Sequence, residues 1–266
     1  MRYTEKMDEN YKSHRSVLQQ NIREQLHTDN LREGPGDAGS TRRAFSLLTD
    51  LPPDPNILDI GCGPGMQTVE VAQLIGNGRI TALDLKSAFL EELSRRAKSA
   101  DLDDKVVTVQ GSMFDLPYPP NSFDAIWCEG AIFIIGFEKG LNEWAAALKP
   151  RGYLAATHLS WLKTNIPDEP KRYWAKAYPA ITSVEQNLEI ANRAGYEQLG
   201  HFTLPPSAWW TDYYTPIERK IAELKGKYAD DPVAMSILER SHQESDLYRM
   251  YADCYGYVFY VMRKKT

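Results

Sequence analysis

Cysteine is scarce in this sequence, and its placement excludes the sites that cysteine usually builds. The chain has three, Cys62, Cys128 and Cys254, which are odd in number, far apart and without any Cys-x-x-Cys spacing. Such a pattern gives neither a disulfide framework nor a zinc site. We therefore predict a protein of the reducing cytoplasm that holds no metal ion.

Long apolar runs and a strong excess of one charge are absent too. The residues that follow Met1 lack the apolar core of a signal peptide, and the longest clean apolar run, Ala131 to Ile135, is far too short to span a bilayer. The 31 Lys and Arg face 36 Asp and Glu, which gives a formal charge of −5. This balance argues against a nucleic acid or an anionic membrane as the main partner.

The strongest pattern that is present begins at Ile57. Residues 57–60 are apolar except for Asp59 and predict a buried strand; glycines follow at 61, 63 and 65, and residues 66–74 carry apolar side chains at helical spacing. Glycine lets the backbone turn sharply and lets a ligand approach the main chain. A second predicted strand ends at Asp84, about twenty residues beyond the loop, where nucleotide-binding folds place the acid that holds a ribose. Together these features predict a site for a nucleotide-like cofactor.

Two details select among such cofactors. A dinucleotide fingerprint needs glycine at the sixth position of this loop, which Met66 occupies. Asp59, at the carboxyl end of its strand, would repel a pyrophosphate but attract the sulfonium and ammonium groups of S-adenosylmethionine. The segment Leu58–Gly65 resembles motif I of the class I S-adenosylmethionine-dependent methyltransferases, and the Leu-Lys-Pro-x-Gly-x-Leu string at 148–154 resembles another family segment. The whole chain is most similar to a prokaryotic subgroup of small-molecule methyltransferases in that family.

The resemblance implies an α/β fold with a Rossmann-like, seven-stranded, mostly parallel sheet, helices on both faces and an antiparallel last strand. We expect an N-terminal helical lid over residues 1–40. The methyltransferase domain is expected over residues 41–266, with helical cap inserts at about 161–180 and 205–255. Between lid and core, Ser40 or Thr41 is expected to cap a helix over residues 42–48.

The same resemblance implies which residues bind the cofactor. They lie in the glycine loop and at the ends of the first four predicted strands, and the third strand leads into the segment that borders the adenine in the family. Family members commonly have an acidic residue where this chain has Ser112, whose hydroxyl offers a weaker hydrogen bond. The candidates are Asp59, Gly61, Cys62, Gly63, Gly65, Asp84, Leu85, Gly111, Ser112, Met113 and Glu129.

Methyl transfer from a sulfonium mainly requires that donor and acceptor be aligned and desolvated. A base is needed only if the acceptor must lose a proton first, because a neutral amine attacks directly and loses its proton afterwards. Glu129 and His158, at the predicted ends of two strands, are the catalytic candidates. For each, a structural place at the rim of the site is the alternative.

Two segments outside the sheet pattern are rich in aromatic residues, and we expect them to form the acceptor pocket. Aromatic faces attract cations and stack on planar molecules, whereas the alternative is that these rings simply pack the cap onto the core. At least one of Trp209 and Trp210, which follow a Pro-Pro turn, is expected to face the pocket. The acceptor candidates are Tyr11, Trp161, Trp209, Trp210 and Tyr213.

We therefore predict a cytoplasmic enzyme that transfers a methyl group from S-adenosylmethionine to a small-molecule acceptor, which is an amine, a hydroxyl compound or an aromatic. A homodimer is compatible with the sequence. Two alternatives stay open: an NAD- or FAD-linked oxidoreductase, which Met66 and Asp59 disfavour, and a protein that binds S-adenosylmethionine without catalysis, such as a sensor.

Overall fold

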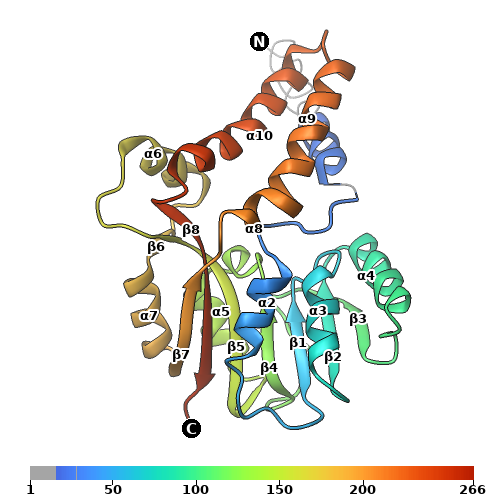
Figure 1. The fold of residues 1–266 in the computed structure, drawn as a ribbon, viewed down its shortest axis with the longest axis vertical. Coiled ribbons are helices and arrows are strands. Elements are labelled where there is room, and N and C mark those ends of the chain that lie inside the picture. Colours follow the sequence, from blue (N-terminus) through green and yellow to red (C-terminus); the bar gives the residue numbers. More distant parts are fainter. Residues whose placement is uncertain (1–15, 28) are drawn as a thin grey trace, which may run out of the picture.

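The protein is built on one mixed β-sheet (Figure 1). The structure, a computed structural model, describes residues 16–27 and 29–266. The strands follow the order β3-β2-β1-β4-β5-β8-β7, and β6 pairs with β5. They are β1 (Asn56–Ile60), β2 (Arg79–Asp84), β3 (Val106–Gln110), β4 (Phe123–Cys128), β5 (Leu148–Trp161), β6 (Thr182–Ser183), β7 (Tyr196–Thr203) and β8 (Tyr255–Lys264).

Strands β1 to β5 pair in parallel, and β8 lies antiparallel between β5 and β7. The Rossmann-like sheet and its antiparallel last strand are therefore confirmed. The eighth strand, β6, was not expected, because a strand of two residues leaves no alternating pattern in the sequence.

Helices cover both faces of the sheet (Figure 1). Ala44 of α2, Val71 of α3 and Leu93 of α4 belong to one apolar cluster, whereas Leu141 of α5 and Ala191 of α7 belong to the cluster on the other face. The helices are α2 (Ala38–Phe45), α3 (Met66–Leu74), α4 (Ser87–Ser99), α5 (Phe137–Trp144), α6 (Asp168–Ala177), α7 (Val184–Arg193), α8 (Ser207–Trp209), α9 (Thr215–Lys227) and α10 (Pro232–Tyr251), with a 3-10 turn at Ile132–Ile134 and a π-helical turn at Trp210–Tyr214.

A third apolar cluster lies away from the sheet and forms the core of a cap. Ile22 and Leu26, from a helix over residues 16–27, pack with Ile221 of α9 and Leu238 of α10. In Figure 1 these helices stand above the end of the sheet to which the parallel strands point. The N-terminal helix is thus part of the same apolar unit as the insert between β7 and β8.

Helix α2 begins earlier than its sequence suggested, and the expectation that Ser40 or Thr41 caps it is wrong. The cap is Asp37, whose extended backbone lets its carboxylate accept a 2.8 Å hydrogen bond from the Ser40 amide. Thr41 instead lies inside the helix with its side chain buried. The early start therefore frees the Thr41 hydroxyl for a contact with the core, described below.

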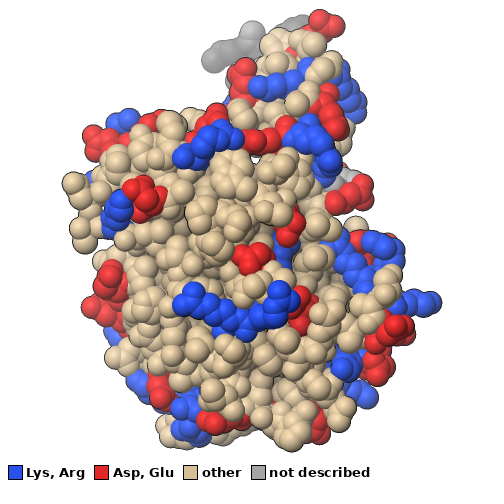
Figure 2. Space-filling view, viewed as in Figure 1, with Lys and Arg blue, Asp and Glu red and all other residues tan. Residues whose placement is uncertain are grey.

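None of the helices described here is long and apolar enough to cross a membrane. On the face shown in Figure 2, acidic and basic side chains are interspersed, and neither sign covers a large part of the surface.

Candidate active site

A cavity of about 790 Å³ lies between the sheet and the cap. Its volume falls within the usual range for small-molecule and cofactor sites. One end, the glycine-loop end, is lined by Gly61 to Pro64, Leu83 to Lys86 and Gly111 to Phe114. The other, the aromatic end, is lined by Trp174, Tyr178, Trp209, Tyr213, Tyr214 and Tyr257.

The glycine loop takes a shape that other residues would resist. Gly61, Gly63 and Gly65 have φ values of +70°, +53° and +87°, all in the left-handed region that favours glycine. A Cβ atom on Gly61 would lie 2.5 Å from the Ala131 Cβ, and one on Gly65 would lie 2.2 Å from the Leu93 Cδ1. A Cβ on Gly63 would meet nothing closer than the Glu33 Cγ at 3.7 Å. Gly61 and Gly65 are thus required by packing, whereas Gly63 leaves open space at the cavity wall.

Asp84 ties the glycine loop to the end of β2. Its Oδ2 accepts a 2.9 Å hydrogen bond from the Gly63 amide, and its Oδ1 accepts a 3.0 Å bond from the Lys86 amide. Because a carboxylate has about four acceptor positions, it keeps lone pairs for further donors in the cavity that it lines. Further hydrogen-bond donors in the cavity can therefore reach this carboxylate.

Asp59 lies behind the loop and does not line the cavity. Its Oδ2 accepts hydrogen bonds from the Thr68 hydroxyl at 2.6 Å and from the Gln67 amide at 3.4 Å, and its Oδ1 has no partner among the described residues. Burial raises the pKa of Asp59 from 3.8 to about 7, against the Thr68 hydrogen bond, which lowers it. Gln67, which does line the cavity, therefore stands between this carboxylate and any ligand.

The raised pKa of Asp59 predicts a pH dependence of stability. The folded state binds the Asp59 proton more tightly than the unfolded state does. Asp59 therefore contributes its full share to the stability of the fold below about pH 4, and this contribution is lost as the pH rises through about 7. The asparagine in Asp59→Asn does not ionise. The free energy of unfolding of this variant should therefore rise relative to that of the wild type, by up to about 1.4 kcal/mol per pH unit across this window. Urea unfolding from pH 4 to 8 checks this, with exposed Asp54→Asn as control. A difference between Asp59→Asn and wild type that stays constant with pH would contradict the pKa assigned to Asp59.

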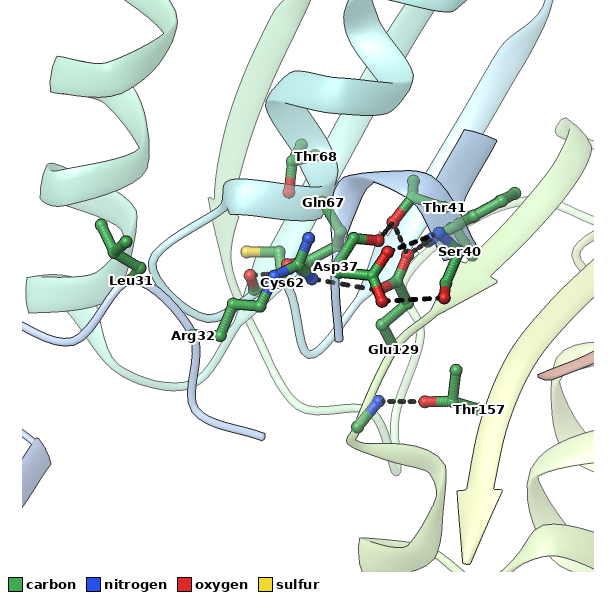
Figure 3. Close-up of polar contacts among 12 residues, drawn as sticks. Leu31, Arg32, Asp37, Ser40, Thr41, Cys62, Gln67, Thr68, Glu129 and Thr157 are labelled. Carbon is green, nitrogen blue, oxygen red and sulfur yellow. Dashed lines mark hydrogen bonds and ion pairs between the residues drawn. The ribbon is translucent and has the colours of Figure 1, made fainter. Parts of the chain in front are cut away.

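Glu129, just beyond β4, is the centre of a buried polar network (Figure 3). Its Oε1 accepts from the Thr41 hydroxyl at 2.7 Å and from the Trp127 indole at 2.9 Å, while the Arg32 guanidinium donates to its Oε2 at 3.0 Å. The side chains of Arg32 and Glu129 are only 5% and 3% exposed. Three donors therefore use most of the acceptor positions of this carboxylate, which the sequence made a candidate for catalysis and for cofactor binding.

The segment between Arg32 and α2 forms part of the cavity wall. Gly36 packs against the ion pair, since a Cβ at this position would lie 2.8 Å from an Arg32 guanidinium nitrogen. The Gly36 amide donates a 3.0 Å hydrogen bond to the Ala208 carbonyl of α8. Glu33, Gly34 and Pro35, within the same segment, line the cavity. The ion pair thus anchors one cavity wall to both the sheet and the cap.

His158 was expected at the end of its strand. It lies within the strand instead, because β5 continues to Trp161. It is 1% exposed, its ring stacks on Phe137 at 4.7 Å and meets Tyr178 edge-on at 5.7 Å. Burial lowers its pKa to about 3, and it does not line the cavity. The structure therefore places His158 behind the cavity wall as a neutral ring.

The other candidates divide between the cavity wall and positions outside it. Gly61, Cys62, Gly63, Asp84, Leu85, Gly111, Ser112, Met113 and Glu129 line the cavity, as do Trp209 and Tyr213. Asp59, Gly65, Trp161 and Trp210 do not. Tyr11 lies outside the described residues.

Several cavity residues were not recognised in the sequence. Arg32 and Glu244 are single charged residues in polar helical or loop sequence, where solvent exposure is the usual outcome. Tyr257 belongs to an apolar strand, which gives no sign that one of its rings faces a ligand. For Arg32, the only sequence feature nearby was the glycine-rich loop Gly34–Gly39, which indicates an unusual backbone. No local sequence feature indicated that Glu244 would line the cavity.

Comparison with known proteins gives this site a family. A family model described as a methyltransferase domain matches residues 57–152. The chain is 28% identical over 215 residues to 27-O-demethylrifamycin SV methyltransferase of Amycolatopsis mediterranei, covering 75% of this chain and 76% of that protein. It is also 28% identical over 177 residues to sterol 24-C-methyltransferase ERG6B of Gibberella zeae, covering 62% of this chain but 46% of that protein. The chain thus matches less than half the length of the sterol enzyme.

Solved structures show the same fold over nearly the whole chain. A methyltransferase from Geobacter sulfurreducens, solved with S-adenosyl-L-homocysteine, superposes with a TM-score of 0.76 at 17% identity, covering 92% of this chain and 98% of that one. YjhP from E. coli superposes with a TM-score of 0.77 at 18% identity, covering 92% and 99%. Residues 57–152 thus match a methyltransferase-domain family model, and nearly the whole chain shares the fold of solved S-adenosylmethionine-dependent methyltransferases.

Proposed function

We propose that the protein transfers a methyl group from S-adenosylmethionine to a small molecule bound at the aromatic end of the cavity. The observation that carries this proposal is the continuity of one cavity from the glycine loop and Asp84 to the ring-lined wall beneath the cap. A single enclosure suits a reaction in which two ligands must meet away from bulk water. The relatives named above act on acceptors as unlike as a rifamycin and a sterol, so the acceptor must be inferred from this chain's own cavity.

The residues present fit the cofactor. Gly63 leaves open space beside the main chain, and Asp84 keeps acceptor capacity for ribose hydroxyls beside its two amide partners. Ser112 and Met113 line the same end of the cavity and provide a hydroxyl and an apolar surface for an adenine. S-adenosylmethionine bound there supplies an activated methyl group on a sulfonium.

The chain's own part is to hold, orient and shield. The Arg32–Glu129 pair fixes the segment that lines the cavity between the two ends. With three donors on its carboxylate, Glu129 is suited to holding this wall rather than to taking a proton. His158 lies outside the cavity, and a neutral amine needs no base before attack. We therefore assign catalysis to alignment and desolvation.

Calorimetric titration with S-adenosylhomocysteine tests the cofactor site directly. Asp84→Asn should bind about ten- to hundred-fold more weakly than the wild type, because a charged hydrogen-bond acceptor is lost. The exposed Asp103→Asn should bind normally. Equal affinity of Asp84→Asn and wild type would refute the ribose assignment. Release of S-adenosylhomocysteine from S-adenosylmethionine with an acceptor panel then separates an enzyme from a binding protein without turnover.

We also propose a cytoplasmic location and no nucleic-acid or membrane partner. The three buried free cysteines suit a reducing compartment, and the charges on the face in Figure 2 are mixed rather than basic. A homodimer stays a proposal that light scattering of the purified protein would test.

A further inference from the structure

The aromatic end of the cavity holds a carboxylate that the proposed reaction does not use. Glu244 of α10 lines the cavity together with Trp209, Tyr213 and Tyr214. The Tyr214 hydroxyl donates to its Oε1 at 2.9 Å, and the Tyr173 hydroxyl donates to its Oε2 at 3.3 Å. Both oxygens are thus held in place by tyrosines, and each keeps a free acceptor position.

No cation pairs with Glu244 among the residues that the structure describes. The ion pairs within 4.0 Å join other groups. Of the basic residues that line the same cavity, Arg32 is bound to Glu129, His27 lies beside Glu33, and exposed Arg240 donates to the Ser236 hydroxyl. Lys86 lies at the glycine-loop end, and exposed Arg23 acts on Glu244 through its charge without forming an ion pair with it. Burial raises the pKa of Glu244, although the hydrogen bonds from Tyr214 and Tyr173 and the charges of His27 and Arg23 lower it. A carboxylate in such a place favours a ligand that brings the missing positive charge.

The rings around Glu244 favour the same ligand. Trp209 lies 5.2 Å from Tyr257 and 5.7 Å from Tyr214 between ring centroids, and Tyr213 lies 5.1 Å from Tyr214. Aromatic faces attract ammonium groups most strongly where water is excluded. A wall that combines several rings with one carboxylate therefore selects a cation over a neutral molecule of the same shape.

We propose that the methyl acceptor carries an ammonium group and that Glu244 and the surrounding rings bind it at the aromatic end. This inference rests on the proposed function, because it names the acceptor class of the same site. Glu244 is a substrate-binding residue in this account, and the methylated atom lies elsewhere on the acceptor or on the same nitrogen after it loses its proton.

The test uses simple probes and the full chain saturated with S-adenosylhomocysteine. Phenethylamine and its uncharged counterpart 2-phenylethanol are titrated by calorimetry, and cyclohexylamine and cyclohexanol form a second pair. The variant is Glu244→Gln, which keeps the shape and an oxygen acceptor for Tyr214 but removes the charge. The control is Glu239→Gln, on the same helix but exposed and away from the cavity.

Wild type and Glu239→Gln should bind each amine about tenfold or more tightly than its alcohol. Glu244→Gln should lose this preference while its affinity for the alcohols and for S-adenosylhomocysteine is unchanged, which also shows that it is folded. A wild type without preference for amines, or a preference that persists in Glu244→Gln, overturns the inference. Failure to bind S-adenosylhomocysteine would instead overturn the proposed function, so the two failures are distinguishable.

Discussion

Replacing Arg32 by alanine should lower the free energy of unfolding by about 3–5 kcal/mol, because it leaves the Glu129 carboxylate buried without its cation. The guanidinium and carboxylate are 3.0 Å apart, and both side chains are almost fully buried. Urea unfolding near neutral pH measures the loss. Because Arg32 also anchors the segment that lines the cavity, the affinity for S-adenosylhomocysteine should fall as well.

Two further variants show whether the charge causes this loss. Arg95→Ala breaks an exposed ion pair with Glu92, in which Arg95 is 67% exposed, and should cost less than about 1 kcal/mol. Arg32→Met combined with Glu129→Gln removes both charges and leaves an amide oxygen for the Thr41 and Trp127 donors. This double variant should recover most of the stability lost in Arg32→Ala. If Arg32→Ala costs no more than Arg95→Ala, the buried pair does not hold the segment.

Changing Gly63 to valine should weaken S-adenosylhomocysteine binding at least about hundredfold. The new side chain would enter the open space at the cavity wall, where the nearest atom to a Cβ is 3.7 Å away. It would also resist the φ of +53°, at a cost of about 1–3 kcal/mol. Calorimetric titration measures the first effect, and urea unfolding measures the second.

Gly195→Val separates these two effects. Gly195, between α7 and β7, has a φ of +87° and nothing within 4 Å of an added Cβ. It should therefore show the backbone cost without any loss of ligand affinity. Normal binding by Gly63→Val would mean that the glycine loop does not contact the cofactor.

The parts of the fold that sequence predicts are those whose signals are local. An apolar run, three glycines at fixed spacing and an acid at the end of the next strand lie within about thirty residues, the length of one βαβ unit. The structure places Gly63 and Asp84 in direct hydrogen-bond contact, so this part of the site follows from spacing alone.

The rest depends on contacts between distant segments. His158 could be taken for a strand end because β5 is extended beyond it by pairing with two segments distant in sequence. Ser160 and Trp161 pair with Gly256 and Tyr255 of β8 on one side and with the two residues of β6 on the other. Arg32 and Glu129 are 97 residues apart in sequence, and no local pattern links them. From sequence alone, Glu244 looks like an exposed acidic residue of a helix. Only the fold brings Tyr173 and Tyr214 into hydrogen-bond contact with it.

The cap also bears on how such a protein can change over evolution. Strands β7 and β8 are antiparallel neighbours, which a turn of a few residues could join, yet the chain makes the whole excursion of α8, α9 and α10 between them. The residues that pair in the sheet and the contact between Gly63 and Asp84 lie outside that excursion. Mutations in this excursion can therefore change the aromatic end of the cavity without touching the glycine loop. The excursion of one homologue should be exchangeable for that of another at Leu204 and Cys254 only together with the helix over residues 16–27, which shares its apolar core.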